Sequence, residues 1–170
     1  MTRTIPLIIF IALAALLFAS LGKDHSPKSP WEGRRLPALS ATKLGEKAPS
    51  PIAPNGVTLI NLFASWCTPC LVEHPQLKAL VQEHDVRIIG IAWNDTPDAV
   101  RAFLKTHGNP YREVYLDSTG DNAIALGLRG VPESYLVGAD GRILYHLAGP
   151  LTAQVVEKEL LPLLETSRVP

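Results

Sequence analysis

The stretch "FASWCTPC", Phe63–Cys70, contains both cysteines of this 170-residue chain. It follows a nearly continuous apolar run over residues 56–65, "GVTLINLFAS", which predicts a strand buried on both faces. It leads into residues 70–84, "CLVEHPQLKALVQEH", where apolar residues recur at helical spacing. The positions with that spacing are Leu71, Leu77, Leu80 and Val81. The cysteine pair is therefore expected where a buried strand ends and a helix begins.

This position favours redox chemistry. Free backbone N–H groups and the positive end of the helix dipole both stabilise a thiolate over a thiol. A thiol of pKa about 8.5 is only a few per cent ionised at pH 7, and lowering that pKa to about 7 requires about 2 kcal/mol. Cys67, at the helix start, is predicted to attack a disulfide, and Cys70, one turn deeper, to resolve the mixed disulfide.

Two nearby cysteines also have uses other than redox exchange. A structural disulfide across two residues would stabilise the fold little, because the loop it closes is short. A zinc site normally takes its second ligand pair from another segment, and no such pair is found. Copper handling by Cys67, Cys70 and His74 stays open, because thiolates and imidazole suit copper. Haem attachment would require a histidine directly after Cys70, where Leu71 stands.

The balance of charges argues against a nucleic-acid partner. Sixteen basic and sixteen acidic residues give a formal net charge of zero, so no field attracts nucleic acid. The length suits one domain with an appendage. We expect a monomer with no nucleic-acid partner, no metal and no resident cofactor.

The N-terminus carries an uncharged apolar segment, "IPLIIFIALAALLFASL", over residues 5–21. A spanning helix needs about 17–25 residues, whereas the apolar core of a cleaved signal peptide has about 7–15. We predict a signal-anchor over 1–22 with Arg3 on the cytoplasmic side, so that the rest of the chain is exported. Cleavage near Ser20-Leu21-Gly22 and a buried core helix are the alternatives. In an oxidising compartment the cysteine pair can be oxidised.

The remaining pattern predicts a tether over 23–35, rich in Pro, Gly and charges, and one domain over 36–166. Residues 36–44 are expected to hold a short edge strand. The further expected strands are 86–93, 112–117 and a hairpin over 134–149, and the further expected helices are 96–108, 120–128 and 152–165. Strands alternating with helices predict an α/β fold with a central sheet flanked by helices.

From about Leu36 to Leu164 the chain resembles the thioredoxin superfamily, and within it the membrane-anchored thiol:disulfide interchange proteins of cytochrome c biogenesis, of the DsbE/CcmG type. The resemblance is densest in the segments "WCTPCLVEHP", "GIAWNDTPDAVRAFL", "GNPYREVYLD" and "GLRGVPESYLVGADGRILYHLAGPL". It implies a thioredoxin-like fold with a central αβ insert between "NPY" and "GLRG", and a cis peptide bond before Pro132. Trp66, Val131 and Pro132 would then contact substrate next to the cysteines.

The resemblance also implies a function. The protein would be a periplasmic reductant on the bacterial inner membrane, acting on the haem-site cysteines of apocytochrome c or on a partner maturation protein. A membrane thiol-reductant transporter would supply the electrons. Two alternatives remain: an anchored reductase that serves another protein, and a non-enzymatic copper module.

Two acids near the pair support the reductant. The buried aspartate of thioredoxin is replaced by Asn61, whereas the biogenesis group has glutamates at the positions of Glu73 and Glu133. Negative charge there disfavours a thiolate and makes the pair more reducing. The simpler interpretation is that both glutamates are solvated.

Five further residues stand out in the sequence. Trp66 either shields the active site or lies in the core, and Trp93 is expected in the core. Asp95 and Tyr111 match the family pattern without an assigned role. His146 is expected at solvent or at a sheet edge.

Overall fold

The computed structural model describes residues 10–11, 13–15 and 29–168 of the chain. Most of the predicted signal-anchor therefore lies outside the described residues. Within the described part, no helix is both long enough and apolar enough to cross a membrane.

A seven-stranded mixed sheet forms the centre of the domain. Its strands are β1 (Ser40–Lys43), β2 (Pro49–Pro51), β3 (Thr58–Phe63), β4 (Arg87–Trp93), β5 (Glu113–Asp117), β6 (Glu133–Val137) and β7 (Ile143–Ala148). Their order is β2-β1-β5-β4-β3-β6-β7, in which β3, β4 and β5 are parallel and the other neighbours antiparallel. The α/β fold predicted from the sequence is confirmed, and β5 lies where the insert was expected.

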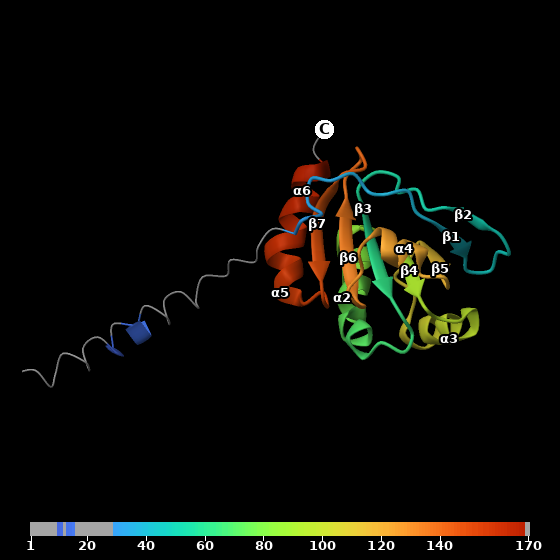
Figure 1. Ribbon diagram of the computed structural model, residues 1–170, viewed down its shortest axis with the longest axis horizontal. Coiled ribbons are helices and arrows are strands. Elements are labelled where there is room, and N and C mark those ends of the chain that lie inside the picture. The colour runs from blue at the N-terminus through green and yellow to red at the C-terminus, as the bar shows by residue number, and fades with distance from the viewer. Residues whose placement is uncertain (1–9, 12, 16–28, 169–170) are drawn as a thin grey trace, which may run out of the picture.

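Helices cover the sheet (Figure 1). They are α2 (Thr68–His84), α3 (Pro97–His107), α4 (Asp121–Ala125), and a C-terminal stretch of α5 (Ala153–Val155), the π-helical η1 (Val156–Leu160) and α6 (Leu161–Arg168). Figure 1 shows the C-terminal stretch beside β7, and the β1–β2 hairpin at the opposite end of the sheet.

Apolar side chains cover both faces of the central strands. On β3, Leu59 and Phe63 face the cluster built by α2, α3 and the C-terminal helices. Ile60 and Leu62 face a second cluster formed with the N-terminal part of the domain. All four side chains are fully buried. The run of apolar residues in β3 thus reflects burial on both faces.

The expected edge strand is placed differently. β1 lies between β2 and β5, so it is an inner strand, and β2 forms the edge. The sequence predicts an edge strand in 36–44 and only a connection at Pro49 and Pro51, so the strand β2 is not expected there. Proline cannot donate to a ladder and is tolerated at a sheet edge, which is where β2 lies.

Residues 29–36, which include the end of the expected tether, lie against the domain. The Gly33 N–H donates to Ile143 O at 2.8 Å, and the Ile143 N–H donates to Arg34 O at the same distance. The Trp31 ring packs edge-on against Tyr135 at 6.2 Å between centroids. The first residues of β7 are therefore paired on their outer side.

Gly90 in β4 is tightly packed against two aromatic rings. A Cβ atom there would lie 2.9 Å from the Tyr111 ring and 3.0 Å from Phe63. We expect Gly90→Ala to lower the free energy of unfolding by about 1–3 kcal/mol, because the inner strands leave little room for either ring to move. Gly130→Ala is the matched control, since a Cβ atom there meets nothing within 4 Å. If urea unfolding shows that both variants lose the same free energy of unfolding, the close packing around Gly90 is not the cause.

Candidate active site

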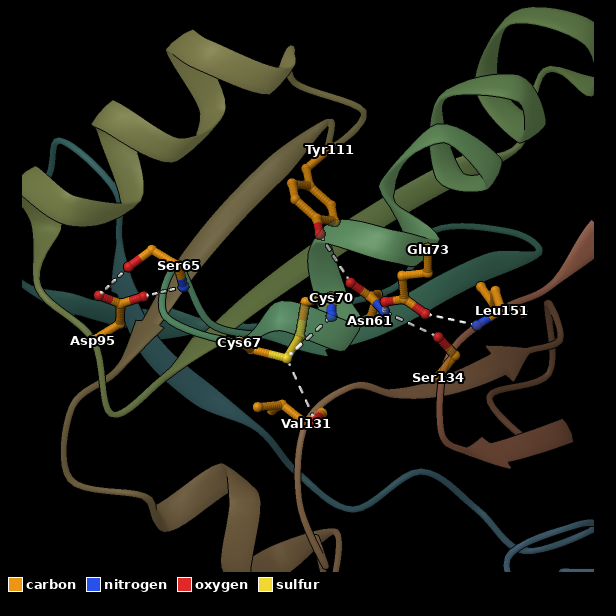
Figure 2. The surroundings of a disulfide bond; sticks show 10 residues. All are labelled: Asn61, Ser65, Cys67, Cys70, Glu73, Asp95, Tyr111, Val131, Ser134 and Leu151. Carbon is orange, nitrogen blue, oxygen red and sulfur yellow. Dashed lines mark hydrogen bonds between the residues drawn. A yellow bond between two sulfur atoms is a disulfide. The ribbon is translucent and has the colours of Figure 1, made fainter.

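Cys67 and Cys70 form a disulfide at the start of α2 (Figure 2). Cys67 is the N-cap residue, with extended backbone, and its Sγ accepts a hydrogen bond from the Cys70 N–H at 3.1 Å. Thr68 and Pro69 follow, and proline suits the first helical turn because its missing N–H has no partner there anyway. The predicted position of the pair is confirmed. In the reduced protein the same N–H stabilises a Cys67 thiolate.

The loop before β6 lies against the pair. Val131 O is 3.5 Å from Cys67 Sγ, and the Val131–Pro132 peptide bond is cis, as the resemblance implied. The Gly149 N–H donates to Pro132 O at 3.0 Å, which ties this loop to the end of β7. The structure thus brings Val131 and Pro132 beside the attacking sulfur.

Trp66, directly before Cys67, is 56% exposed, which excludes a core role. Its indole N–H donates to Asn94 O at 3.1 Å, and its ring lies 6.0 Å from that of Trp93. Trp93 is half-buried, so its expected core position holds only in part. The exposed indole is therefore fixed next to the disulfide.

Two further apolar side chains are exposed near the pair in sequence. Leu71 is 41% exposed and Val72 69%. The helix that the apolar spacing predicts is confirmed, and of the residues with that spacing Leu77 and Leu80 are buried whereas Leu71 is exposed. Cys70 and Glu73 of the same part of α2 are buried, so Leu71 and Val72 lie on the face of the helix that points away from the core.

Asp95 has a structural role that the sequence did not reveal. Its carboxylate accepts hydrogen bonds from the Ser65 N–H at 2.6 Å and the Ser65 hydroxyl at 3.0 Å. It also accepts from the Thr96 N–H at 2.7 Å, at the start of α3. Asp95 therefore fixes the loop that carries Trp66 and Cys67 to the neighbouring helix.

A buried hydrogen-bond network surrounds Glu73, which is fully buried and not solvated. Its two carboxylate oxygens accept from the Asn61 amide and the Leu151 N–H, each at 2.8 Å. The Asn61 amide also donates to the Ser134 hydroxyl at 3.0 Å, and its oxygen accepts from the Tyr111 hydroxyl at 2.9 Å. Figure 2 shows these groups converging next to the disulfide. The sequence assigns no role to Tyr111, and the structure shows that its hydroxyl orients Asn61.

The carboxyl group of Glu73 changes its charge near neutral pH. Burial raises its pKa to about 7, although the hydrogen bonds from the Leu151 N–H and the Asn61 amide act in the opposite direction. Glu73 follows Cys70 by three residues and so lies one helical turn further along α2. A carboxyl group with this pKa can bind or release a proton at neutral pH while Cys70 changes between thiol and disulfide.

Glu133 also is buried, at 2% exposure, and opens β6 directly after Pro132. Burial acts to raise its pKa, but hydrogen bonds from His146, the Arg129 N–H and Tyr135 outweigh it, so that the pKa lies below the usual value. The carboxyl group is therefore a buried negative charge near the active-site loop. Sequence alone could not distinguish this from a solvated loop residue.

The copper alternative finds no support in the geometry of His74. Its Nε2–H donates to Gly108 O at 2.9 Å, and its ring packs edge-on against Phe103. In the described part of the chain, no group of three or more His, Cys, Asp or Glu side chains is arranged to hold a metal ion. His74 thus serves the packing of α2 against the α3–β5 connection.

The arrangement is built for dithiol–disulfide exchange. Cys67, the more reactive cysteine, lies at the N-terminus of a helix. Cys70 follows one helical turn later and forms the disulfide with it, and a loop with a cis-proline faces Cys67. The fold and the site together define a thiol:disulfide oxidoreductase with a thioredoxin-like fold.

Comparison with known proteins agrees with this class. The Redoxin family model matches residues 32–160. The chain is 35% identical to the thiol:disulfide interchange protein HelX of Rhodobacter capsulatus, over 94% of this chain and 93% of that protein. It is 38% identical to the thiol:disulfide interchange protein DsbE of Allochromatium vinosum, over 94% and 90%. The structure of a secreted thiol-disulfide isomerase from Corynebacterium glutamicum superimposes with a TM-score of 0.67 at 23% identity, covering 83% of this chain and 96% of that one.

The chain therefore belongs to the Redoxin family, among relatives named thiol:disulfide interchange proteins. The resemblance to the DsbE type noted in the sequence is confirmed.

Proposed function

We propose that this protein is a membrane-anchored reductant of the periplasmic space that serves cytochrome c maturation. Cys67 attacks a substrate disulfide, forming a mixed disulfide and releasing one substrate thiolate, which takes up a proton. Cys70 then attacks Cys67 Sγ, which releases the second substrate thiolate and leaves the Cys67–Cys70 disulfide. Two electrons pass to the substrate, and a membrane thiol-reductant transporter restores the dithiol.

The observation that carries the proposal is the pair of buried acids. Glu73 lies one helical turn beyond Cys70, and Glu133 lies two residues beyond Val131, whose carbonyl meets Cys67 Sγ. Both side chains have almost no contact with solvent, so their charge is screened weakly. Negative charge near Cys67 disfavours the thiolate, so the disulfide is favoured and the dithiol gives up its electrons readily. A reductant of this kind suits haem attachment, because thioether formation with haem requires free thiols on the Cys-x-x-Cys-His segment.

The exposed side chains support a protein substrate. Trp66, Leu71 and Val72 present apolar surface close to the disulfide in sequence. Exposed apolar groups at a reactive site indicate contact with another macromolecule. We expect the Val131 carbonyl, 3.5 Å from Cys67 Sγ, to accept a hydrogen bond from the backbone of an extended substrate bound at the pair.

The reduction potential of the Cys67–Cys70 pair tests the proposal, measured by equilibration with glutathione or dithiothreitol. We expect about −200 mV or lower, the range of glutaredoxins and thioredoxin. A value near that of the oxidant DsbA, about −120 mV, would contradict the reductant. The reduced protein should also reduce an oxidised Cys-x-x-Cys-His peptide faster than a matched peptide without the histidine. Equal rates would assign the reductase to a different protein substrate.

The anchor and its orientation form part of the proposal. The apolar segment within 1–22 is long enough to span a membrane, and Arg3 favours a cytoplasmic N-terminus. In cell fractionation the full chain should stay with the membrane after carbonate extraction, and protease added to spheroplasts should degrade its domain. Release by carbonate would contradict the anchor, and protection from protease would contradict the periplasmic orientation.

A further inference from the structure

His146 of β7 lies against the buried Glu133 of β6. Its Nε2 is 3.3 Å from Glu133 Oε2, and the two side chains are 11% and 2% exposed. Glu133 accepts two more hydrogen bonds, from the Tyr135 hydroxyl at 2.9 Å and the Arg129 N–H at 3.1 Å. Because an ionised carboxylate only accepts hydrogen bonds, the facing Nε2 must carry a proton.

The ring of His146 is held from three sides. It stacks on the Tyr135 ring at 4.4 Å between centroids, with 26° between the planes. Its Nδ1 lies 2.5 Å from the hydroxyl of Ser29, in the segment that packs along β7. The Ser29 oxygen also accepts from the Trp31 N–H at 3.2 Å, so its own proton is free to point at Nδ1. His146 thus has little freedom to turn away from Glu133.

The carboxylate that His146 holds is close to the chemistry along the chain. Glu133 follows the cis peptide bond directly, and Val131 O is 3.5 Å from Cys67 Sγ. The backbone of Glu133 is fixed as well, because it pairs with Leu62 on one side and Ala148 on the other. The side chain shares the face of Leu62, which is the sheet face opposite α2, and it is two residues along the backbone from the carbonyl that meets Cys67.

We propose that His146 is a positioning residue that keeps the Glu133 carboxylate charged and in place, and thereby sets the reducing strength of the cysteine pair. The proposal rests on the proposed function, in which buried negative charge makes the pair reducing. Ser29 orients the His146 ring for this role, so the segment that follows the expected anchor contributes to the active site.

The consequence of removing His146 has a definite direction. Without the hydrogen bond from its Nε2–H, burial of Glu133 persists while one opposing interaction is lost, so the pKa of Glu133 rises. The carboxylate is then held less firmly and its ionised form is favoured less, so it opposes the Cys67 thiolate less. The dithiol becomes relatively more stable, and the protein becomes a weaker reductant.

A double-mutant cycle separates this role from a merely structural one. We expect His146→Leu to shift the equilibrium with glutathione toward the reduced protein by about three- to tenfold, where tenfold corresponds to about 30 mV. Glu133→Gln should shift it in the same direction and by at least as much. In the Glu133→Gln background, His146→Leu should change nothing further, because it acts through that charge. Equal shifts in both backgrounds, or no shift in the single variant, would overturn the proposal.

Two conservative variants test the hydrogen bond itself. The amide nitrogen of Gln occupies the place of Nε2, and that of Asn the place of Nδ1. His146→Gln should therefore stay within twofold of the wild type, whereas His146→Asn should behave as His146→Leu. His146 lines a cavity bounded by residues 29–32, β7 and the C-terminal helices, so these smaller side chains fit without crowding. The reverse order of Gln and Asn would overturn the role assigned to Nε2.

The controls keep the two proposals apart. His84 lies at the other end of α2, about 20 Å from Cys70 along the helix axis. His84→Leu should therefore leave the equilibrium between the protein and glutathione unchanged. Far-UV circular dichroism and thermal unfolding show whether each variant is folded, and His146→Gln gives the decisive comparison if His146→Leu is not. A wild-type potential near −120 mV would contradict the reductant function, yet the comparison between variants would still decide the role of His146.

Discussion

Replacing Cys67 with serine is expected to abolish disulfide reduction, to the background of the assay, because a hydroxyl at this position cannot attack a disulfide. Replacing Cys70 is expected to have a different result. In Cys70→Ser, Cys67 still attacks and forms the mixed disulfide, but no second sulfur resolves it. The covalent adduct between protein and substrate should then accumulate.

Non-reducing gel electrophoresis followed by mass spectrometry distinguishes the two outcomes. The chain has only two cysteines, so an adduct of Cys70→Ser can involve only Cys67. The adduct should disappear on addition of dithiothreitol. Adducts from Cys67→Ser but not from Cys70→Ser would contradict the attacking role inferred from the position of Cys67 at the N-cap of α2.

Replacing Glu73 with glutamine is expected to change how stability depends on pH. The pKa of Glu73 is about 7 in the folded protein, against 4.5 as its ordinary value. Between these values the folded state binds more protons than the unfolded state, so the contribution of Glu73 to the free energy of unfolding falls as the pH rises. A shift of this size corresponds to about 3 kcal/mol between pH 4 and pH 8.

Urea unfolding of both proteins across that range measures this effect. The variant loses an acceptor for either the Leu151 N–H or the Asn61 amide, which lowers its stability by about 1–3 kcal/mol at every pH. The readout is therefore the difference between variant and wild type, which should move by about 3 kcal/mol in favour of the variant from low to high pH. Glu83→Gln, at an exposed position of the same helix, is the matched control. A constant difference would show that Glu73 titrates near its ordinary value.

The elements of the fold that local residues encode could be predicted. α3 begins after Thr96, whose hydroxyl accepts from the Ala99 N–H, and ends at Gly108 with a φ of 88°. Each of these features depends on residues within a few positions in the sequence. The position of the cysteines at a strand–helix junction could be predicted for the same reason.

The environment of the acids could not be predicted in this way. Glu73 is buried because Asn61 of β3 and the Leu151 N–H, 78 residues away, supply its hydrogen bonds. Glu133 depends on His146 of the next strand. Such contacts arise from the order and register of the strands, which the sequence pattern of a single segment does not contain. Only the resemblance to a family pointed to these two glutamates.

The edge strand β2 has a consequence for how copies of the protein meet. Its three residues are Pro49, Ser50 and Pro51, so only Ser50 has a backbone N–H. An open sheet edge normally offers a row of donors and acceptors on which a strand from another molecule can assemble. The two prolines leave this edge unable to template such growth, which disfavours aggregation through the sheet.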